Sequence, residues 1–318
     1  MSLLISVCVY TFNRAELLAK ALESVCNQAL PSELYEVVVV DNRSTDDTRE
    51  VVKDLEKHKL NLRYFYEERQ GISYAKNRGW SEASGEYVGF LDDDGVAPPD
   101  WLSIATEVIH LTSPDLFGGP YYPIYDTPKP VWFKDEYGTF SAGADARALI
   151  SSDEYLSGGN LFIRRRLLER MGGFNPGLGM QGKQIGYGEE TALIRRIRQE
   201  NREAQIYYEP RLYIYHRVRP EKMRFTWQLR HRFAQGRDGY LTFSDGVHRM
   251  TLRHMIGFLA LPPVIAIDAT IGVILRNRKT YPYPQNYYYE RVFQRIATFG
   301  KLYERLRSTL GARRAVDG

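Results

Sequence analysis

Residues 87–94 read Tyr-Val-Gly-Phe-Leu-Asp-Asp-Asp, an apolar run that ends in three carboxylates. Such a continuous apolar run is typical of a strand that is buried on both faces, as in a parallel sheet covered by helices. Three adjacent acids repel one another unless a cation lies among them. This stretch therefore predicts a buried strand whose carboxyl end carries a cation site.

The residues before this stretch extend the same pattern. Apolar β-branched runs alternate with amphipathic stretches, which predicts an α/β fold with a Rossmann-like, mostly parallel central sheet flanked by helices. We expect strands over residues 5–10, 36–40, 62–66 and 87–91. We expect helices over residues 14–27, from Ser44 or Thr45 to Leu55, and over 72–83.

Three polar clusters follow the ends of these strands, at residues 11–14, 41–46 and 92–94. Ligands of such sheets bind beyond the carboxyl ends of the strands, so the clusters should converge. The acidic triplet suits Mg²⁺ or Mn²⁺, which takes few protein oxygens and fills its shell from phosphates and water. Extended backbone would point Asp92 and Asp94 the same way.

The second half of the chain is less regular. Residues 115–157 are rich in Gly, Pro, Tyr and Trp, which indicates long loops or added strands. A strand at 158–163, a helix at 165–171 and a glycine-rich loop at 172–188 follow, and Glu189-Glu190 then opens another helix. The two acids could merely complement that helix dipole. Trp101 is interpreted as a core residue.

With these motifs in order, the chain resembles family 2 glycosyltransferases, whose fold is called GT-A, over roughly residues 3–236. The resemblance rests on residues 7–14, 40–46, 71–79, 85–94, 99–102, 158–160, 172–174 and 188–190. It implies an inverting transferase that moves a hexose or N-acetylhexosamine from a nucleotide sugar, in particular a UDP-sugar. The implied acceptor is a saccharide or a lipid-linked sugar of cell-surface polysaccharide or glycolipid synthesis.

The resemblance also implies which residues bind the donor. Asp41 matches the position that hydrogen-bonds the uracil ring, and Thr11 and Arg14 line the same pocket, within the motif that also contains Asn13. Lys76 stands where the family usually has arginine. It keeps a charge near base or phosphate but gives up bidentate geometry.

The acidic triplet takes the metal side of the donor in this resemblance. Asp94 is expected to be the direct ligand of Mn²⁺ or Mg²⁺, Asp92 to meet the ribose and the metal, and Asp93 to assist. His216 follows a short apolar stretch, and its imidazole is an acceptable ligand for Mn²⁺. A structural or phosphate-contacting role for His216 stays open.

The acceptor hydroxyl must lose a proton as it attacks, and one carboxylate on the acceptor side suffices for this. The family pattern places that base at Glu190, with Glu189 as the alternative. The segment Gly158, Gly159 and Asn160 resembles the place where backbone approaches the acceptor sugar. Glycine suits such a close approach because it has no side chain.

The last third of the chain differs in charge. Residues 1–216 hold 24 Lys and Arg against 32 Asp and Glu, whereas residues 217–318 hold 19 against 7. We place the end of the catalytic domain at residue 236 and a basic, helical extension at 237–318.

Residues 255–275 are long and apolar enough for a membrane span, although Pro262-Pro263 and Asp268 oppose one.

Three arrangements of that apolar segment stay open: an interfacial or re-entrant helical hairpin, a true span, and a buried helix pair on the catalytic domain. Basic flanks favour peripheral membrane contact through residues 249–279.

The expected location is the cytoplasm, at the inner face of the cell membrane. Two cysteines, Cys8 and Cys26, are too few for a disulfide framework, and the chain starts on a strand.

Two other functions compete with this interpretation. A nucleotidyltransferase also uses strand-end aspartates and a metal, but it would need a glycine-rich basic loop after the first strand, which residues 11–14 do not provide. A non-catalytic module that binds nucleotide sugars or nucleic acid would also explain a basic third. Its arginines surround an apolar segment instead of interleaving with aromatic residues, so we expect no nucleic-acid partner.

Overall fold

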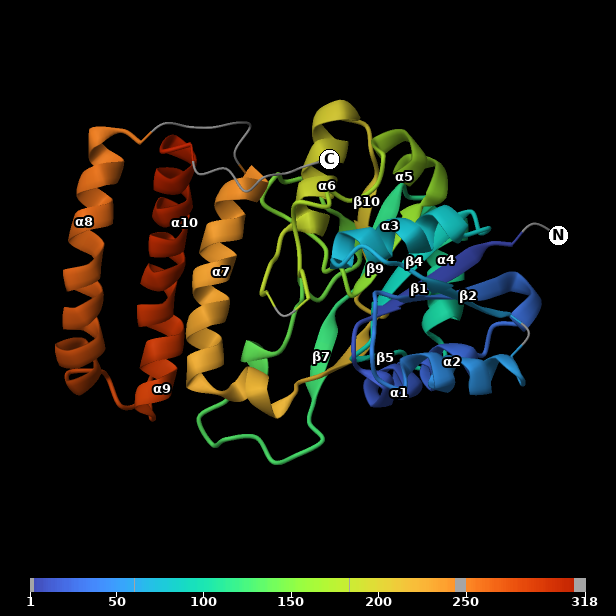
Figure 1. Cartoon of the computed structure of the whole chain (residues 1–318), viewed down its shortest axis with the longest axis horizontal. Coiled ribbons are helices and arrows are strands. Elements are labelled where there is room, and N and C mark those ends of the chain that lie inside the picture. The colour runs from blue at the N-terminus through green and yellow to red at the C-terminus, as the bar shows by residue number, and fades with distance from the viewer. Residues whose placement is uncertain (1–2, 60, 183, 244–249, 312–318) are drawn as a thin grey trace. The chain divides into compact units, whose positions relative to one another are not determined.

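The computed structural model describes residues 3–59, 61–182, 184–243 and 250–311 (Figure 1). The chain forms two compact units. The sheet unit comprises Met1–Asp126, Asp135–Pro176 and Glu189–Val218. The helical unit comprises Thr127–Lys134, Gly177–Gly188 and Arg219–Gly318. The domain boundary expected at residue 236 therefore falls inside a helix of the helical unit, and the division between units comes earlier.

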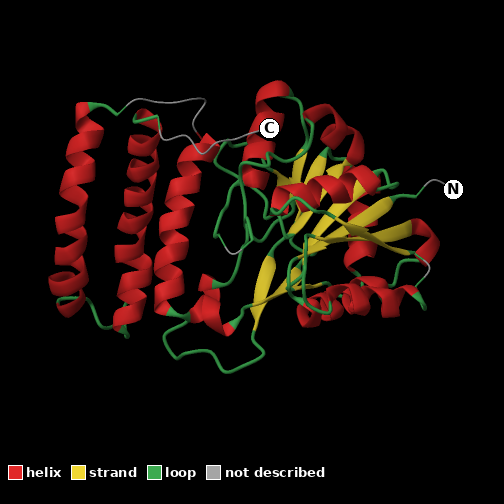
Figure 2. Ribbon diagram, in the orientation of Figure 1, coloured by secondary structure: helices red, strands yellow, loops and turns green. Residues whose placement is uncertain are grey.

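The sheet unit is built on a mixed sheet, whose strands are yellow in Figure 2. This sheet has eight strands in the order β3-β2-β1-β4-β9-β6-β10-β8. Its first four strands are parallel, whereas β9 runs antiparallel to both β4 and β6. The strands are β1 Ile5–Thr11, β2 Tyr35–Asp41, β3 Leu62–Tyr66, β4 Tyr87–Asp92, β6 Leu116–Gly118, β8 Arg147–Ala148, β9 Asn160–Arg164 and β10 Ile206–Tyr208. A second sheet, in the order β5-β11-β7, consists of β5 Gly95–Val96, β11 Ile214–Arg217 and β7 Tyr121–Ile124.

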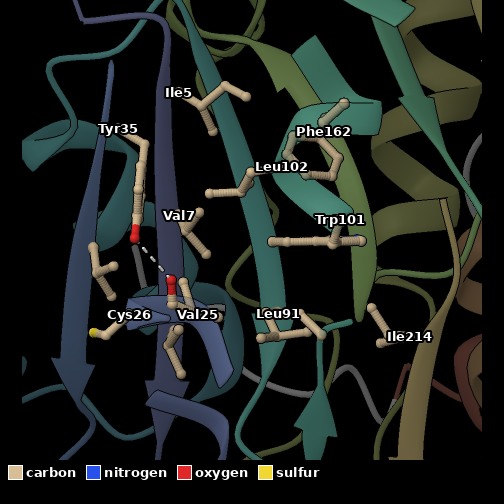
Figure 3. Packing of buried hydrophobic residues seen from close by; sticks show 14 of the residues in the cluster. Ile5, Val7, Val25, Cys26, Tyr35, Leu91, Trp101, Leu102, Phe162 and Ile214 are labelled. Atoms are coloured by element: carbon tan, nitrogen blue, oxygen red, sulfur yellow. Dashed lines mark hydrogen bonds between the residues drawn. The ribbon is translucent and has the colours of Figure 1, made fainter. Parts of the chain in front are cut away.

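Helices cover both faces of the large sheet. One core cluster joins the sheet to α1 Ala15–Cys26, α2 Thr48–Glu56 and α4 Trp101–Thr112. The other joins it to α3 Ile72–Glu82, α5 Arg165–Met171 and α6 Glu189–Glu200. The unit also has short 3₁₀ turns at Ser32–Leu34 and Asp135–Tyr137. Trp101 is fully buried beside Phe162, as Figure 3 shows, which confirms its interpretation as a core residue.

Alternation along the strands explains these two clusters. In β1, Ile5, Val7 and Val9 contribute to the first cluster, whereas Cys8 and Tyr10 contribute to the second. Successive side chains of a strand point to opposite faces, so a strand covered on both faces must be apolar throughout. The expected buried parallel sheet is thereby confirmed.

Two local expectations are wrong. Ser44 and Thr45 do not cap a helix, because α2 begins only at Thr48 and these two residues instead bond to neighbouring strand-end loops. Extended backbone ends at Asp92, since Asp93 and Asp94 form a turn into β5. The argument that strand alternation points Asp92 and Asp94 the same way therefore fails.

The helical unit contains α7 Phe225–Phe243, α8 Leu252–Ile267, α9 Pro284–Tyr287 and α10 Phe293–Thr309. A 3₁₀ turn at Pro220–Met223 precedes α7, and π-helical turns at Asp268–Gly272 and Tyr288–Val292 extend α8 and α9. Glycines let α7 and α10 approach closely. A Cβ on Gly236 would lie 1.7 Å from the Ala297 carbonyl oxygen, and one on Gly300 would lie 2.3 Å from that of Phe233.

The apolar segment forms one continuous helix from Leu252 to Gly272, 21 residues, long and apolar enough to cross a membrane. It runs through Pro262 and Pro263 without a turn, so the helical hairpin, one of the three arrangements left open, is wrong. None of its residues is buried in the described structure. Phe258 stacks on Phe299 of α10, with ring centroids 5.1 Å apart. The exposed apolar side chains include Leu252, Met255, Ile256, Leu259, Val264, Ile267, Ile271, Ile274 and Leu275.

Candidate active site

The ends of β1 and β4 bring the first polar cluster onto the acidic triplet. The Thr11 hydroxyl donates to Oδ2 of Asp93 at 2.8 Å, and Nη1 of Arg14 donates to Oδ1 of Asp93 at 2.7 Å. The same Arg14 nitrogen lies 4.0 Å from Asp94. Burial, with the neighbouring Asp94 charge and against the opposing effect of Arg14, raises the pKa of Asp93. Arg14 is thus the cation that offsets the charge of this turn.

The end of β2 adds the third cluster. Asp41 is buried, and its carboxylate accepts hydrogen bonds from the Ser44 amide and the Tyr64 hydroxyl, both at 2.8 Å. Asn13, which has a positive φ of 53°, accepts a hydrogen bond from the Thr45 amide at 2.7 Å. The three strand-end clusters therefore converge, as the sequence predicted.

Asp94 faces His216 across the second sheet. Because β11 pairs with β5, His216 lies opposite Gly95, and its Nε2 is 3.3 Å from Oδ1 of Asp94. The amide of Arg217 also donates to the Asp94 carbonyl at 2.8 Å. No three His, Cys, Asp or Glu side chains gather as a metal site within the described ranges. A carboxylate beside an imidazole nevertheless fits a divalent cation that takes its remaining ligands from phosphates and water.

Asp92 makes other contacts. Its Oδ1 accepts a hydrogen bond from the Tyr10 hydroxyl, and a Cβ on Gly159 would lie 2.6 Å from its Oδ2. The neighbouring Gly158 stands against the other carboxylate, since its Cβ would lie 1.7 Å from Oε1 of Glu190. Two consecutive glycines thus contact Asp92 on one side and Glu190 on the other.

Asn160 anchors this glycine pair. Its side chain is fully buried, accepts a hydrogen bond from the Trp101 indole at 3.0 Å, and donates to the carbonyls of Pro120 and Leu212 at 3.0 and 2.6 Å. The amide of Asn160 is therefore engaged within the protein. What the segment offers a ligand is the backbone of Gly158 and Gly159.

Glu189 and Glu190 begin α6 and share one cation. The Lys76 ammonium, from α3, donates to Glu189 at 3.0 Å and also to Glu190. Burial, together with the Glu190 charge, raises the pKa of Glu189 to about 8. Lys76 outweighs the effect of burial and lowers the pKa of Glu190. At neutral pH, one carboxylate of the pair is ionised and the other is protonated.

Two tyrosines were not predicted from the sequence. Tyr10 holds Asp92, and Tyr64 holds Asp41. The signal for both is register: Tyr10 lies directly opposite Asp92 once β1 and β4 are paired in parallel, and Tyr64 lies on β3 beside β2. Without the strand order, neither aromatic residue differs from an ordinary strand residue.

The glycosyl transferase family 2 model matches residues 6–172, which include the three strand-end clusters but neither Glu190 nor His216. That match covers more than half of the 318 residues. The chain belongs to glycosyl transferase family 2, and it is a glycosyltransferase.

Curated relatives support the same class. The chain is 26% identical over 242 residues to a glucosyl-dolichyl phosphate glucuronosyltransferase of Haloferax volcanii, covering 74% of this chain and 75% of that protein. It is 46% identical over 92 residues to the GalNAc(5)-diNAcBac-PP-undecaprenol beta-1,3-glucosyltransferase of Campylobacter jejuni, covering 28% of this chain and 29% of that protein. Both relatives are named for lipid-linked acceptors.

Among solved structures, a mannosyltransferase from Pyrobaculum calidifontis in complex with GDP-Man and Mn²⁺ has a TM-score of 0.61. The two are 20% identical, and the alignment covers 97% of this chain and 87% of that one. This likeness confirms the GT-A fold expected from the sequence.

Proposed function

We propose that this chain is an inverting glycosyltransferase that moves a sugar from a UDP-sugar to a lipid-linked saccharide. The observation that carries the proposal is the glycine pair Gly158-Gly159, which contacts the donor-side carboxylate Asp92 and the acceptor-side carboxylate Glu190 at once. Side chains on these residues would overlap the two carboxylates, so only glycine lets both approach this backbone. The proposal puts the reacting sugar beside these two carboxylates.

On the donor side, the strand-end loops supply the groups that a nucleoside diphosphate needs. Asp41 is a buried acceptor suited to the N–H of a pyrimidine ring, at the position that the family resemblance assigns to uracil. Thr11, Asn13 and Arg14 lie at the end of the neighbouring strand β1, where Asn13 bonds to the loop that follows Asp41. Arg14 adds a positive charge for the diphosphate. Asp92 and Asp93 complete this side.

Asp94 and His216 are the residues that would hold a divalent cation, with Asp92 as a further candidate ligand. When bound, Mn²⁺ or Mg²⁺ would offset the negative charge that develops on the departing diphosphate. The carboxylates of the turn, Asp93 and Asp94, are both buried, and a divalent cation would offset their charge beside Arg14.

On the acceptor side, Glu190 is the general base, with Glu189 as the alternative. A base must be ionised to accept a proton, and Lys76 keeps Glu190 ionised at neutral pH. The acceptor hydroxyl gives its proton to Glu190 while its oxygen attacks the anomeric carbon. The bond from that carbon to the diphosphate oxygen breaks, and its electron pair leaves with the diphosphate. A single displacement of this kind inverts the anomeric centre.

The lipid-linked acceptor rests on the names of the two relatives and on the helical unit. The outward side chains of α8 form an exposed apolar surface, which in a monomeric soluble protein marks an interaction site. Arg253 precedes this surface, and Arg276, Arg278 and Lys279 follow it, as expected where basic side chains meet phosphate headgroups. We assign this contact to residues 249–279, of which the structure describes 250–279, at the cytoplasmic face of the membrane.

Asp268 does not oppose this assignment. Its carboxylate accepts hydrogen bonds from Nε of Arg295 at 2.6 Å and from the Tyr287 hydroxyl at 2.8 Å, so the charge is paired within the helical unit. The exposed surface of α8 next to it consists of Ile267 and Ile271. The helix can therefore lie in the membrane interface without carrying an unpaired charge into it.

A donor panel tests the proposal. Purified protein would be incubated with UDP-glucose, UDP-N-acetylglucosamine, UDP-glucuronate and GDP-mannose, each with and without Mn²⁺, and nucleotide release would be measured. We expect release from one UDP-sugar that depends on Mn²⁺ and is lost in D94N. Release from none, or equal release by D94N, would sink the proposal, and release from GDP-mannose alone would overturn the uridine assignment.

A further inference from the structure

Lys76 is a lysine that water does not reach. It lies on α3 with no exposed surface, between the rings of Tyr10 and Phe174, whose centroids are 5.0 and 5.2 Å from Nζ. Burying an ammonium without partners costs several kcal/mol, and such a lysine normally loses its proton. Here burial is outweighed by Glu189 and Glu190, and the pKa of Lys76 is raised instead. The ammonium is therefore permanent.

The charges around Lys76 balance only when one of the two glutamates is protonated. Two ionised glutamates beside one ammonium would leave a buried negative charge, and the raised pKa of Glu189 avoids this. With Glu189 neutral and Glu190 ionised, the three groups sum to zero. The other titratable groups that face them are the Cys8 thiol and the Tyr10 hydroxyl, which burial keeps neutral by raising the pKa of each, and the Asp92 carboxylate beyond Tyr10.

The position of Glu190 is fixed from two sides. Lys76 donates to its Oε1, and the missing side chain of Gly158 leaves the space that the same oxygen occupies. An extended glutamate side chain has several rotamers, and a base that wanders by about 1 Å loses on the order of 100-fold in rate. The contact with Lys76 selects one of these positions.

We infer that Lys76 is a positioning residue for the base, whose ammonium holds the Glu190 carboxylate in place and also contacts Glu189. This inference rests on the proposed function of Glu190. It replaces the donor contact expected of Lys76 from the sequence, because the ammonium is enclosed by the two glutamates and two aromatic rings. Lys76 and Glu190 thus form one functional unit.

The first test is K76M, which keeps an unbranched side chain one atom shorter than lysine and removes its charge. Without the ammonium, the pKa of Glu190 rises. In a profile of nucleotide release against pH, the acid limb, where release falls as Glu190 is protonated, should therefore shift to higher pH by about 1 to 3 units. Calorimetric binding of UDP with Mn²⁺ should change less than about threefold, since no donor contact is lost. K76R keeps the charge and should leave the acid limb near that of wild type.

A coupled exchange is the second test, and it does not depend on K76M folding. E190D withdraws the carboxylate from Lys76 and should lower release by about 100-fold. K76R brings a longer, planar cation into the same space and should lower release by about tenfold. If the two residues form one unit, their losses should not multiply. The release rate of K76R/E190D should be at least about tenfold higher than the rate obtained by multiplying the two single losses.

Each outcome decides the inference. A K76M protein that loses UDP binding more than about tenfold while its pH profile is unchanged would make Lys76 a donor ligand. Multiplicative effects in the exchange, or an unmoved acid limb in folded K76M, would overturn the positioning role. Absence of nucleotide release by the wild type would instead be a failure of the proposed function, and the two failures are separated in this way.

Discussion

Gly158 and Glu190 are in such close contact that no other residue type fits at position 158. A Cβ there would lie 1.7 Å from Oε1 and 2.2 Å from Cδ of Glu190. We expect G158A to displace the carboxylate by roughly 1 Å and to lower nucleotide release by about 100-fold, with UDP binding unchanged. G239A is the matched control, because nothing lies within 4 Å of the Cβ it adds on α7. Full activity in G158A would contradict the placement of Glu190 at the reaction centre.

The two glutamates should respond differently to loss of charge. Glu189 is protonated at neutral pH, so E189Q replaces a neutral group by a neutral group that can still donate toward Glu190. We expect E189Q to keep release within about tenfold of wild type, and E190Q to lower it by about 100 to 10,000-fold, the range for a lost general base. The reverse order in a comparison of initial rates would assign the base to Glu189.

The raised pKa of Glu189 also predicts how stability depends on pH. The folded protein holds this proton up to about pH 8, whereas the unfolded chain releases it near 4.5. The contribution of the protonated form is therefore complete below about pH 4.5 and is lost as pH rises toward 8. E189Q cannot lose a proton, so its melting temperature relative to wild type should increase steadily between pH 5 and pH 8.

Thermal melts of both proteins at several pH values check this expectation. The comparison is between variant and wild type at each pH, which removes the contribution of the other titrating groups. A difference that stays constant across the range would mean that Glu189 titrates normally in the folded protein.

Most of the sheet could be predicted because β1, β2 and β4 are largely apolar and each ends at a polar cluster. The convergence of Thr11, Asp41 and Asp93 followed from the rule that parallel strands present their carboxyl ends at one edge. The partner of Lys76 could not be predicted. Its contact with Glu189 joins α3 to α6 across 113 residues of sequence, and only packing brings them together.

For the segment after residue 236, the sequence predicted the character of the residues but not the shape of the helix. Its hydropathy and basic flanks indicate membrane contact, whereas Pro262 and Pro263 oppose a membrane span and leave the arrangement of the segment open. Proline removes one backbone donor and strains the preceding turn, yet a helix that is stabilised by contacts with a neighbour can continue through it. Packing against α10, including the stacking of Phe258 on Phe299, accompanies this continuity.

The pairing of Asp94 with His216 predicts a graded loss of metal affinity. H216A removes one candidate ligand and should weaken Mn²⁺ binding in the presence of UDP by at least about tenfold, whereas D94N should weaken it further. H110A is the control, because His110 is exposed on α4. Titration calorimetry with Mn²⁺ measures all three. Unchanged affinity in H216A would assign the histidine a structural role.

The exposed apolar surface of α8 predicts membrane binding that a pair of charges should abolish. Leu259 and Ile271 are 71% and 54% exposed, and placing each in the apolar interface would contribute about 1.5 to 3 kcal/mol. L259E/I271E should therefore bind vesicles with anionic lipid at least about 100-fold more weakly than wild type in sedimentation assays. L111E introduces the same charge at a 75% exposed leucine of the sheet unit and should bind as wild type does. Equal binding by wild type and L259E/I271E would show that α8 is not the membrane contact.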